Sequence, residues 1–283
     1  MTAFLAMLGA CALLAGTTLL AKLLGGGPEG LGLHPLQISA GRFIFAWAAV
    51  AAVAVVSRPE FAGASWPTHT LRAVCGWLSA SCLFAAAAQM PLASATALSF
   101  LSPLVTMVCA IAFLGERVGK WRWIAASVAL GGALVLIGPG GETFQLAAFI
   151  ALAAALFMGI EGMFIKRLSD TEPPIRILLV NNSIGMVISV AAAALVWQWP
   201  EPLGWGLLIA LGGTMIIAQA LLIQAMKRGD ASLLVPLYYT TLLFAAGLDF
   251  SLFGTVPTLT ASLGAGLIVL GALIITLRGR STA

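Results

Sequence analysis

Long apolar runs separated by short polar segments make up most of the chain. Crossing the hydrocarbon core of a bilayer takes about 20 helical residues at a rise of about 1.5 Å each, and the runs have this length. They are apolar on every face, unlike the alternating strands of a membrane β-barrel. The pattern therefore predicts an all-α integral membrane protein. Its ten transmembrane helices are expected at Phe4–Leu24, Leu36–Val56, Leu71–Met90, Ser94–Leu114, Trp121–Ile137, Phe144–Ile165, Ile177–Val196, Leu203–Met226, Ala231–Phe253 and Leu259–Leu277.

One of these runs, from Ser94 to Gly119, has a weaker copy near the other end of the chain, from Ala231 to Gly254. In both, small residues come first, a proline follows, and a long apolar stretch ends at a glycine. The rest of the two halves aligns with modest changes in spacing, so we expect two five-helix repeats, residues 1–140 and 141–283. Because five is odd, the second repeat enters the membrane from the opposite side, which makes the repeat an inverted one.

Composition agrees with this class of protein. Hydrophobic residues make up 61% of the chain, charged residues 8%, and the mean hydropathy is +1.06, whereas soluble domains are roughly 25% charged. The cysteines fall inside predicted spans and lack the paired spacing of a metal site, so we expect them to pack as small apolar residues. They are Cys11, Cys75, Cys82 and Cys109. We expect neither a metal nor a cofactor.

The basic residues are distributed unevenly among the connecting segments. Of the 14 lysines and arginines, all but Lys22 and Arg42 fall in segments on one side of the predicted bundle, with Arg72 and Arg176 among them. The positive-inside rule assigns that side, and with it both termini, to the cytoplasm. The net charge of +4 therefore reflects contact with the bilayer surface, and we do not expect nucleic acid as a partner.

Two charged residues stand well inside predicted spans, away from the span ends. Glu161 lies in mid-span, where an unpaired charge costs roughly 2.5 to 3.5 kcal/mol. It is either a contact in a central cavity, for a substrate ammonium or a proton, or a buried acid hydrogen-bonded between helices. Arg42 either attracts a substrate carboxylate or ties helices together through carbonyls and a glutamate.

Further candidates lie at the span ends and next to prolines. Lys22 and Asp249 have opposite charge at similar depth near the outer ends of their spans, which suggests an extracellular gate or staple. Proline leaves a helical carbonyl without its donor, and that carbonyl is free for a neighbour or a substrate. The polar residues around the two prolines are Ser99 and Ser102 near Pro103, and Tyr238 and Tyr239 near Pro236.

Three stripes at helical spacing complete the candidate set. They consist of Trp77, Ser81 and Phe84; of Met158 and Glu161; and of Ile216, Gln219 and Ile223. Such stripes are most often helix packing. A cavity lined by aromatic side chains, methionine and few polar groups would also suit an aromatic substrate.

Other classes of function have less support in the sequence. An intramembrane enzyme would need a cluster of catalytic groups, and no GxSxG or HExxH motif is present. A channel would need a carbonyl filter or a ring of charge, and neither pattern occurs. The glycine run 25–27 lacks the Lys-Ser/Thr of a nucleotide-binding loop, so direct ATP drive is not expected.

The ten-span plan, the Gly115-Glu116-Arg117 turn, Arg42 in the second span and the ending Leu263–Ile274 resemble the EamA-type drug/metabolite transporter superfamily. Within it the chain is most similar to bacterial exporters of aromatic amino acids. The resemblance implies a monomeric secondary transporter of the inner membrane that exports such amino acids and related small metabolites by alternating access. Export of other metabolites or drugs is the alternative. The second-half counterpart of Glu116 is Thr255, so only the first half keeps the acidic turn.

Overall fold

The computed structural model describes residues 3–25, 30–59, 61, 63–114, 120–137, 142–169, 171–228 and 240–278, and within these ranges every regular element is a helix. The helices are α1 (Ala3–Leu24), α2 (Pro35–Ser57), α3 (Trp66–Ala87), α4 (Leu92–Ser99), α5 (Ser102–Leu114), α6 (Lys120–Ile137), α7 (Glu142–Ser169), α8 (Pro174–Ala193), α9 (Pro202–Arg228), α11 (Thr240–Phe253) and α12 (Leu259–Arg278). Six of them are long and apolar enough to cross a membrane: α1, α2, α3, α7, α8 and α9.

The span predicted at Ser94–Leu114 as one continuous helix is divided into α4 and α5. Helix α4 ends at Ser99, and Phe100 and Leu101 form the turn before α5 begins. The reason is Pro103, which has no N–H to donate to the carbonyl of Ser99 four residues earlier. This proline therefore starts a new helix instead of softening a continuous one.

The predicted copy of this span, Ala231–Gly254, is described only from Thr240 onward. Its proline, Pro236, lies outside the described residues, as does the Gly115-Glu116-Arg117 turn. The expected glycine stop is present at the other end, where α11 ends at Phe253 and Gly254 has φ +62°. Glycine accepts this left-handed conformation without the steric cost of a Cβ, and its N–H bonds back to the Phe250 carbonyl at 3.1 Å.

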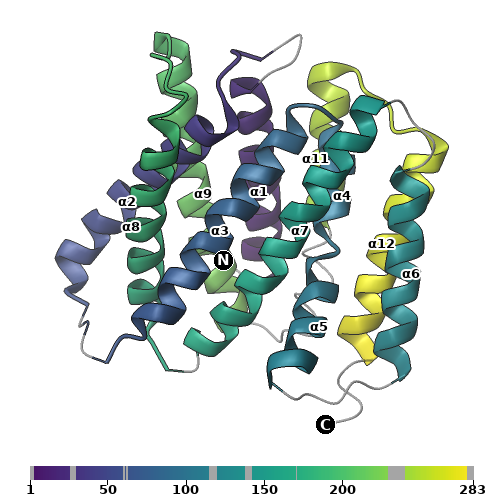
Figure 1. Ribbon diagram of the computed structural model, residues 1–283, viewed down its shortest axis with the longest axis horizontal. Helices are drawn as coiled ribbons and strands as arrows, with labels where there is room; N and C mark the ends of the chain where they lie inside the picture. The colour runs from purple at the N-terminus through teal and green to yellow at the C-terminus, as the bar shows by residue number, and fades with distance from the viewer. Residues whose placement is uncertain are drawn as a thin grey trace.

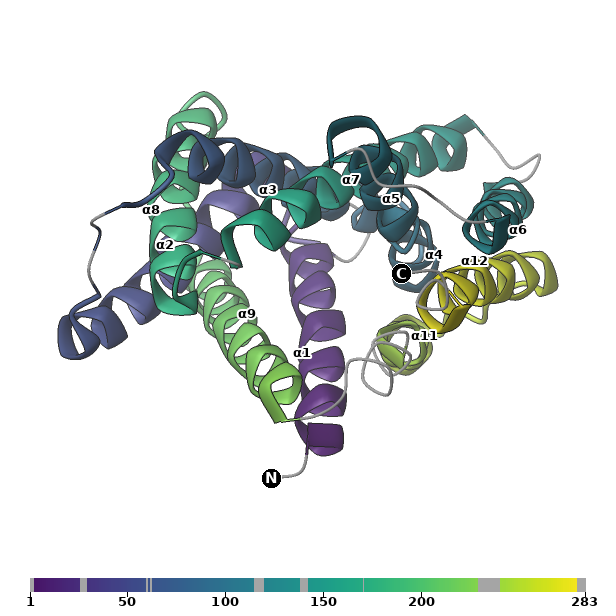
Figure 2. The same cartoon turned by 90° about the horizontal axis from the view of Figure 1, so that it is seen from below.

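The helices pack as a bundle with two edges (Figure 1). Helices α2 and α8 lie against each other at one edge, and α6 and α12 form a close pair at the other, as the view in Figure 2 also shows. Between the edges, α3 packs on α7 and α1 packs on α9. Small residues permit the close α6–α12 approach, because a Cβ on Gly132 would lie 2.7 Å from the Gly264 carbonyl oxygen.

The largest buried cluster of the described residues is rich in alanine and joins α1, α3, α4, α6, α7, α11 and α12. Its members include Ala87, Ala97, Ala133, Ala151 and Ala245, each at most 1% exposed. Alanine-rich contacts let helix backbones come close without large side chains to interlock. The packing brings charged side chains of α3 and α7 within reach of each other.

Candidate functional site

An ion pair inside the bundle joins α3 to α7. Arg72 Nη2 lies 3.8 Å from Glu161 Oε1, with the two side chains 6% and 18% exposed. Arg72 Nη1 also donates a 3.1 Å hydrogen bond to the carbonyl of Ile177, at the start of α8. Gly76, one turn further along α3, makes room for the acid, because a Cβ there would lie 2.9 Å from Glu161 Oε1. Arg72 and Glu161 therefore connect three helices.

The burial of Arg72 corrects its assignment to a cytoplasmic segment. Helix α3 begins at Trp66, earlier than the span predicted from Leu71, so Arg72 lies in the second turn of the helix. Pro67 at the first helical turn allows the earlier start, since proline is well tolerated there. The buried acid predicted at Glu161 thus has a basic partner that the sequence pattern does not indicate.

Arg42 is the second cation near Glu161. Among the described residues, Glu161 and Arg72 lie close enough to interact electrostatically with it. Its guanidinium carbon lies 4.3 Å from the centre of the Phe43 ring. Its Nε is buried and has no hydrogen-bond partner among the described residues. In the part of the chain that the structure describes, two arginines thus lie near one carboxylate, which leaves a formal excess of one positive charge.

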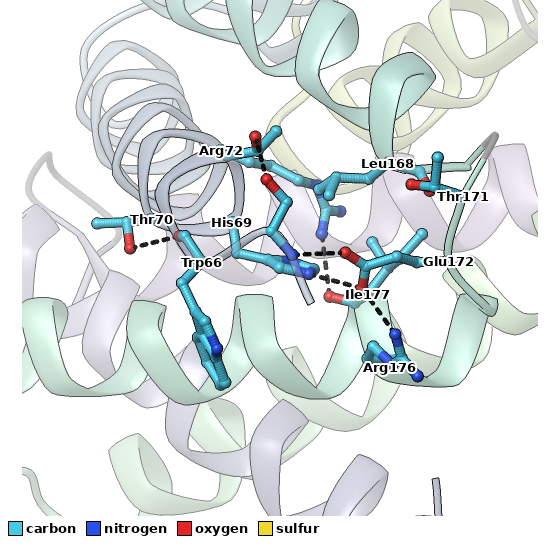
Figure 3. Close-up of polar contacts among 11 residues, drawn as sticks. Trp66, His69, Thr70, Arg72, Leu168, Thr171, Glu172, Arg176 and Ile177 are labelled. Atoms are coloured by element: carbon cyan, nitrogen blue, oxygen red, sulfur yellow. Dashed lines mark hydrogen bonds and ion pairs between the residues drawn. The ribbon is translucent and has the colours of Figure 1, made fainter. Parts of the chain in front are cut away.

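A second buried polar cluster ties the start of α3 to the α7–α8 connection (Figure 3). Glu172 accepts a 3.0 Å hydrogen bond from the Ser65 N–H, lies 2.9 Å from His69 Nε2, and has Arg176 Nη1 at 3.6 Å. The side chains of His69 and Glu172 are almost fully buried. Burial raises the pKa of the Glu172 carboxyl, but the hydrogen bonds from Ser65 and His69 and the charge of Arg176 outweigh it, so the pKa lies below its ordinary value.

No sequence motif marks this cluster. His69 and Glu172 are far apart in the chain and meet only because the start of α3 packs against the end of α7 and the start of α8. Ser65, His69 and Arg72 are spaced by four and three residues, so they share one face of α3. That face runs from the Glu172 cluster to the Arg72–Glu161 pair.

A third polar contact lies at the opposite ends of the helices, where α1 and α11 end and α4 begins (Figure 1). Lys22 Nζ is 3.0 Å from Asp249 Oδ1, and its ammonium also sits 4.2 Å from the centre of the Phe253 ring. Asp249 Oδ2 accepts a 3.0 Å hydrogen bond from the Ala93 N–H in the first turn of α4. The structure therefore brings together the two charges expected to pair, and adds a third helix to them.

The predicted stripe residues divide into two groups. Phe84 is 3% exposed and packs in a core with Leu24 and Leu208, so it fills space. Trp77 Nε1, Ser81 Oγ and Gln219 Oε1 are buried without a hydrogen-bond partner among the described residues. Buried polar atoms are normally satisfied by protein or water. These three atoms are therefore available to a bound molecule.

The structure gives less support to the other predicted site residues. Ser99 is buried and bonds the carbonyl of Thr96 on its own helix at 2.7 Å. Met158 is half-buried on α7, near Glu161 in sequence, and Pro103 lies in the first turn of α5. Pro236, Tyr238 and Tyr239 lie outside the described residues, so the proposed tyrosine contacts stay a prediction.

The described part of the structure includes the following two hollows. One of about 490 Å³ lies between α4, α11 and α12 and is lined mainly by apolar residues such as Leu242 and Val269. The other, of about 540 Å³, lies between α2, α8 and the start of α3 and includes Trp47 and Arg58. Of the predicted site residues that the structure describes, none lines either hollow. The buried charges, and not these hollows, define the candidate site.

This arrangement is that of a carrier site more than of a catalytic one. Charges inside an apolar bundle are costly, and in membrane proteins they mark the pathways of substrates and ions. Groups of three or more potential metal ligands do not occur among the described residues. The chain is a multi-pass membrane protein whose polar residues converge between helices.

Comparison with known proteins identifies the class. The sequence profile of the EamA-like transporter family matches residues 1–138 and 145–277. The chain therefore belongs to the EamA-like transporter family, part of the drug/metabolite transporter superfamily. This membership agrees with the sequence resemblance seen at the Gly115-Glu116-Arg117 turn, in the pattern of apolar spans and in the ending Leu263–Ile274.

Relatives with named cargoes are transporters of small metabolites. A riboflavin transporter of Vibrio cholerae is 30% identical over 69% of this chain and 65% of its own length, slightly under two thirds. An S-adenosylmethionine uptake transporter of Rickettsia bellii is 26% identical over 87% and 85%, and a pseudopaline exporter of Pseudomonas aeruginosa is 26% identical over 74% and 75%. None of these three names points to aromatic amino acids.

One solved crystal structure of a 24% identical protein aligns with a TM-score of 0.67 and covers 98% of both chains. At this identity the likeness concerns the fold alone.

Proposed function

We propose that this protein is a secondary transporter that moves a small amphipathic metabolite across the inner membrane by alternating access, with Arg42, Arg72 and Glu161 at its central site. The observation that carries the proposal is the buried Arg72–Glu161 pair between α3 and α7. A charged pair costs desolvation energy inside a bundle that apolar residues would stabilise as well. Its presence there is explained by contact with a polar cargo.

The proposal includes ten spans arranged as two inverted five-helix repeats. Counting α4 with α5 as the fourth span and α11 as part of the ninth, each span has a counterpart five positions later. The helix contacts then repeat: α3 with α7 corresponds to α9 with α1, α5 with α7 to α11 with α1, and α3 with α8 to α9 with α2. The pairs α2–α8 and α6–α12 map onto themselves. Such symmetry supports two halves that rock about a shared site.

Two polar contacts at opposite ends of the bundle would serve as alternating latches. With both termini in the cytoplasm, the Lys22–Asp249 contact lies on the outer side and the Glu172 cluster on the inner side. The outer contact holds α1, α4 and α11 together, and the inner one holds α3 to α7 and α8. Opening one side requires breaking one set of contacts while the other set persists.

The substrate we propose to test first is an aromatic amino acid, moved outward, with related small metabolites next. Trp77 and the unpartnered polar atoms of Ser81 and Gln219 support a cargo with an apolar ring and polar groups. The relatives include both uptake and export proteins, so the outward direction rests on the resemblance to amino-acid exporters alone. A carrier itself runs in whichever direction the gradient of its substrate drives it.

Reconstitution into liposomes tests the proposal. Liposomes loaded with unlabelled compound are diluted into labelled phenylalanine, tryptophan, riboflavin or S-adenosylmethionine, and accumulation by exchange is followed. A carrier gives saturable accumulation that an unlabelled competitor suppresses. Non-saturating flux indicates a channel, and a chemically altered product indicates an enzyme. Gly213→Ala is a matched control, because a Cβ at Gly213 on α9 meets no atom within 4 Å.

If phenylalanine and tryptophan do not exchange while another metabolite does, the proposal of an aromatic amino-acid substrate is wrong and the proposal of a carrier stands. If none of the panel exchanges with saturation, the carrier proposal fails.

A further inference from the structure

The charge balance of the central site is uneven. Arg72 pairs with Glu161 at 3.8 Å, and among the described residues Glu161 is also the carboxylate within electrostatic range of Arg42. Two positive charges and one negative charge leave an excess of one. An uncompensated buried charge is strongly unfavourable, so a site of this composition is completed by an anion from outside the protein or by water.

The two arginines are not equivalent in their contacts. Arg72 is committed to the protein, since one guanidinium nitrogen lies 3.8 Å from Glu161 and another donates to the Ile177 carbonyl at 3.1 Å. Among the described residues, Arg42 makes no ion pair or hydrogen bond of this kind: its guanidinium lies over the Phe43 ring, and its Nε is buried without a partner. Arg72 therefore uses both terminal nitrogens and leaves only its buried Nε without a partner, whereas, in the described part of the chain, the terminal nitrogens of Arg42 are free for a ligand.

The Arg42 guanidinium is well suited to bind an anion. Its planar fork presents parallel N–H donors that match the two oxygens of a carboxylate, and stacking on an aromatic ring leaves that edge open. A single singly charged group would restore neutrality. A second negative charge on the same group would find no further cation, because Arg72 is already paired with Glu161.

From this geometry we infer that the substrate carries one anionic group, of the carboxylate class, which Arg42 binds, and that this group is required for recognition. The inference rests on the proposed function, because it names the chemistry of the cargo at the same site. It goes further in one respect: a compound with the acid and no amine should bind, and a compound with the amine and no acid should not.

The test uses three molecules with the same phenyl-ethyl body: phenylalanine, 3-phenylpropionate, which lacks the amine, and phenethylamine, which lacks the acid. Binding to the purified protein in detergent is measured by the shift in its thermal unfolding midpoint. This readout does not require transport. We expect stabilisation by phenylalanine and 3-phenylpropionate and none by phenethylamine. Equal stabilisation by the amine, or none by either acid, would overturn the inference.

Arg42 variants identify the residue responsible. Arg42→Gln should weaken binding of the acids about thirtyfold or more, as expected when one partner of a buried charge pair is removed. Arg42→Lys keeps the charge without the fork and should restore part of that loss. If Arg42→Gln binds the acids as tightly as the unchanged protein, Arg42 is not the anion contact. The unfolding midpoint of each Arg42 variant without ligand, compared with that of Gly213→Ala, reports any general loss of fold.

The outcomes separate the inference from the transport proposal. Acid-selective binding that depends on Arg42, without exchange in liposomes, supports the anion site and rejects the carrier. Saturable exchange of a cargo that has no anionic group supports the carrier and rejects the anion site.

Discussion

The contact between Lys22 and Asp249 allows a quantitative test of how the helix ends are held. The ammonium and the carboxylate oxygen are 3.0 Å apart, and Asp249 is 1% exposed. At an effective dielectric constant of about 20, two unit charges at this distance attract by about 5.5 kcal/mol. Desolvation and side-chain ordering offset much of this, so we expect a coupling energy of about 1 to 3 kcal/mol between the two residues.

A double-mutant cycle measures that energy. Asp249→Asn removes the charge and keeps an oxygen that can accept from the Ala93 N–H, while Lys22→Met keeps an apolar stem against Phe253. Unfolding free energies are measured by titrating purified protein in mild detergent with a denaturing one. Each single variant should be destabilised, and the double variant should be less destabilised than the sum of the two. Effects that add to within about 0.5 kcal/mol would show that the ion pair contributes no coupling.

Three further changes follow from the structure. Glu172→Gln should lower the free energy of unfolding by about 1.5 to 3 kcal/mol near neutral pH. Because the pKa of Glu172 is lowered in the folded protein, this stabilisation is present above the ordinary pKa of 4.5 and is lost as the pH falls through the folded pKa. The difference in unfolding free energy between the variant and the unchanged protein should therefore vanish in acid. Gly76→Ala should change the unfolding free energy by less than about 1 kcal/mol, because its Cβ would meet at 2.9 Å the end of the flexible Glu161 side chain, which can shift. Gly213→Ala should be neutral or slightly stabilising in the same denaturant titrations, and a larger loss for Gly76→Ala would show that Glu161 is held in place. Gln37→Ala removes two hydrogen bonds to the backbone of Gln198 and should lower the unfolding free energy by about 1 to 3 kcal/mol. An unchanged midpoint of unfolding would mean that water replaces both hydrogen bonds.

The positions of the helices followed closely from the hydrophobic pattern, because a span in lipid must satisfy its backbone internally and has one workable length. Each predicted span contains a helix in its described part. The break between α4 and α5 was the main difference, and Pro103 explains it. The pattern records where residues are apolar, but not whether a proline bends a helix or ends it.

The candidate site was only partly predictable. Glu161 and Arg42 were recognisable because charges inside apolar runs are rare. Lys22 and Asp249 were recognisable as a pair because their depths match. Arg72 was counted with the cytoplasmic basic residues, at the very start of its predicted span, because a charge near a span end is ordinarily in water.

The Glu172 cluster shows what the sequence lacks. Its partners depend on which face of α3 meets the α7–α8 connection, and helix rotation about its own axis is set by packing. Near-uniform hydrophobicity around each helix leaves that rotation undetermined. Polar contacts between distant residues therefore became visible only in the folded chain.

Alternating access to the site between α3 and α7 is the central claim, and one labelling experiment tests it most directly. Cys11, Cys75, Cys82 and Cys109 are replaced by alanine, and Ser81→Cys puts a single thiol of similar size at a buried atom that has no partner in the described residues. A membrane-impermeant thiol reagent is then applied from either side of oriented vesicles. We predict labelling from both sides, slowed by substrate. Labelling from one side alone, or from neither, would contradict the account.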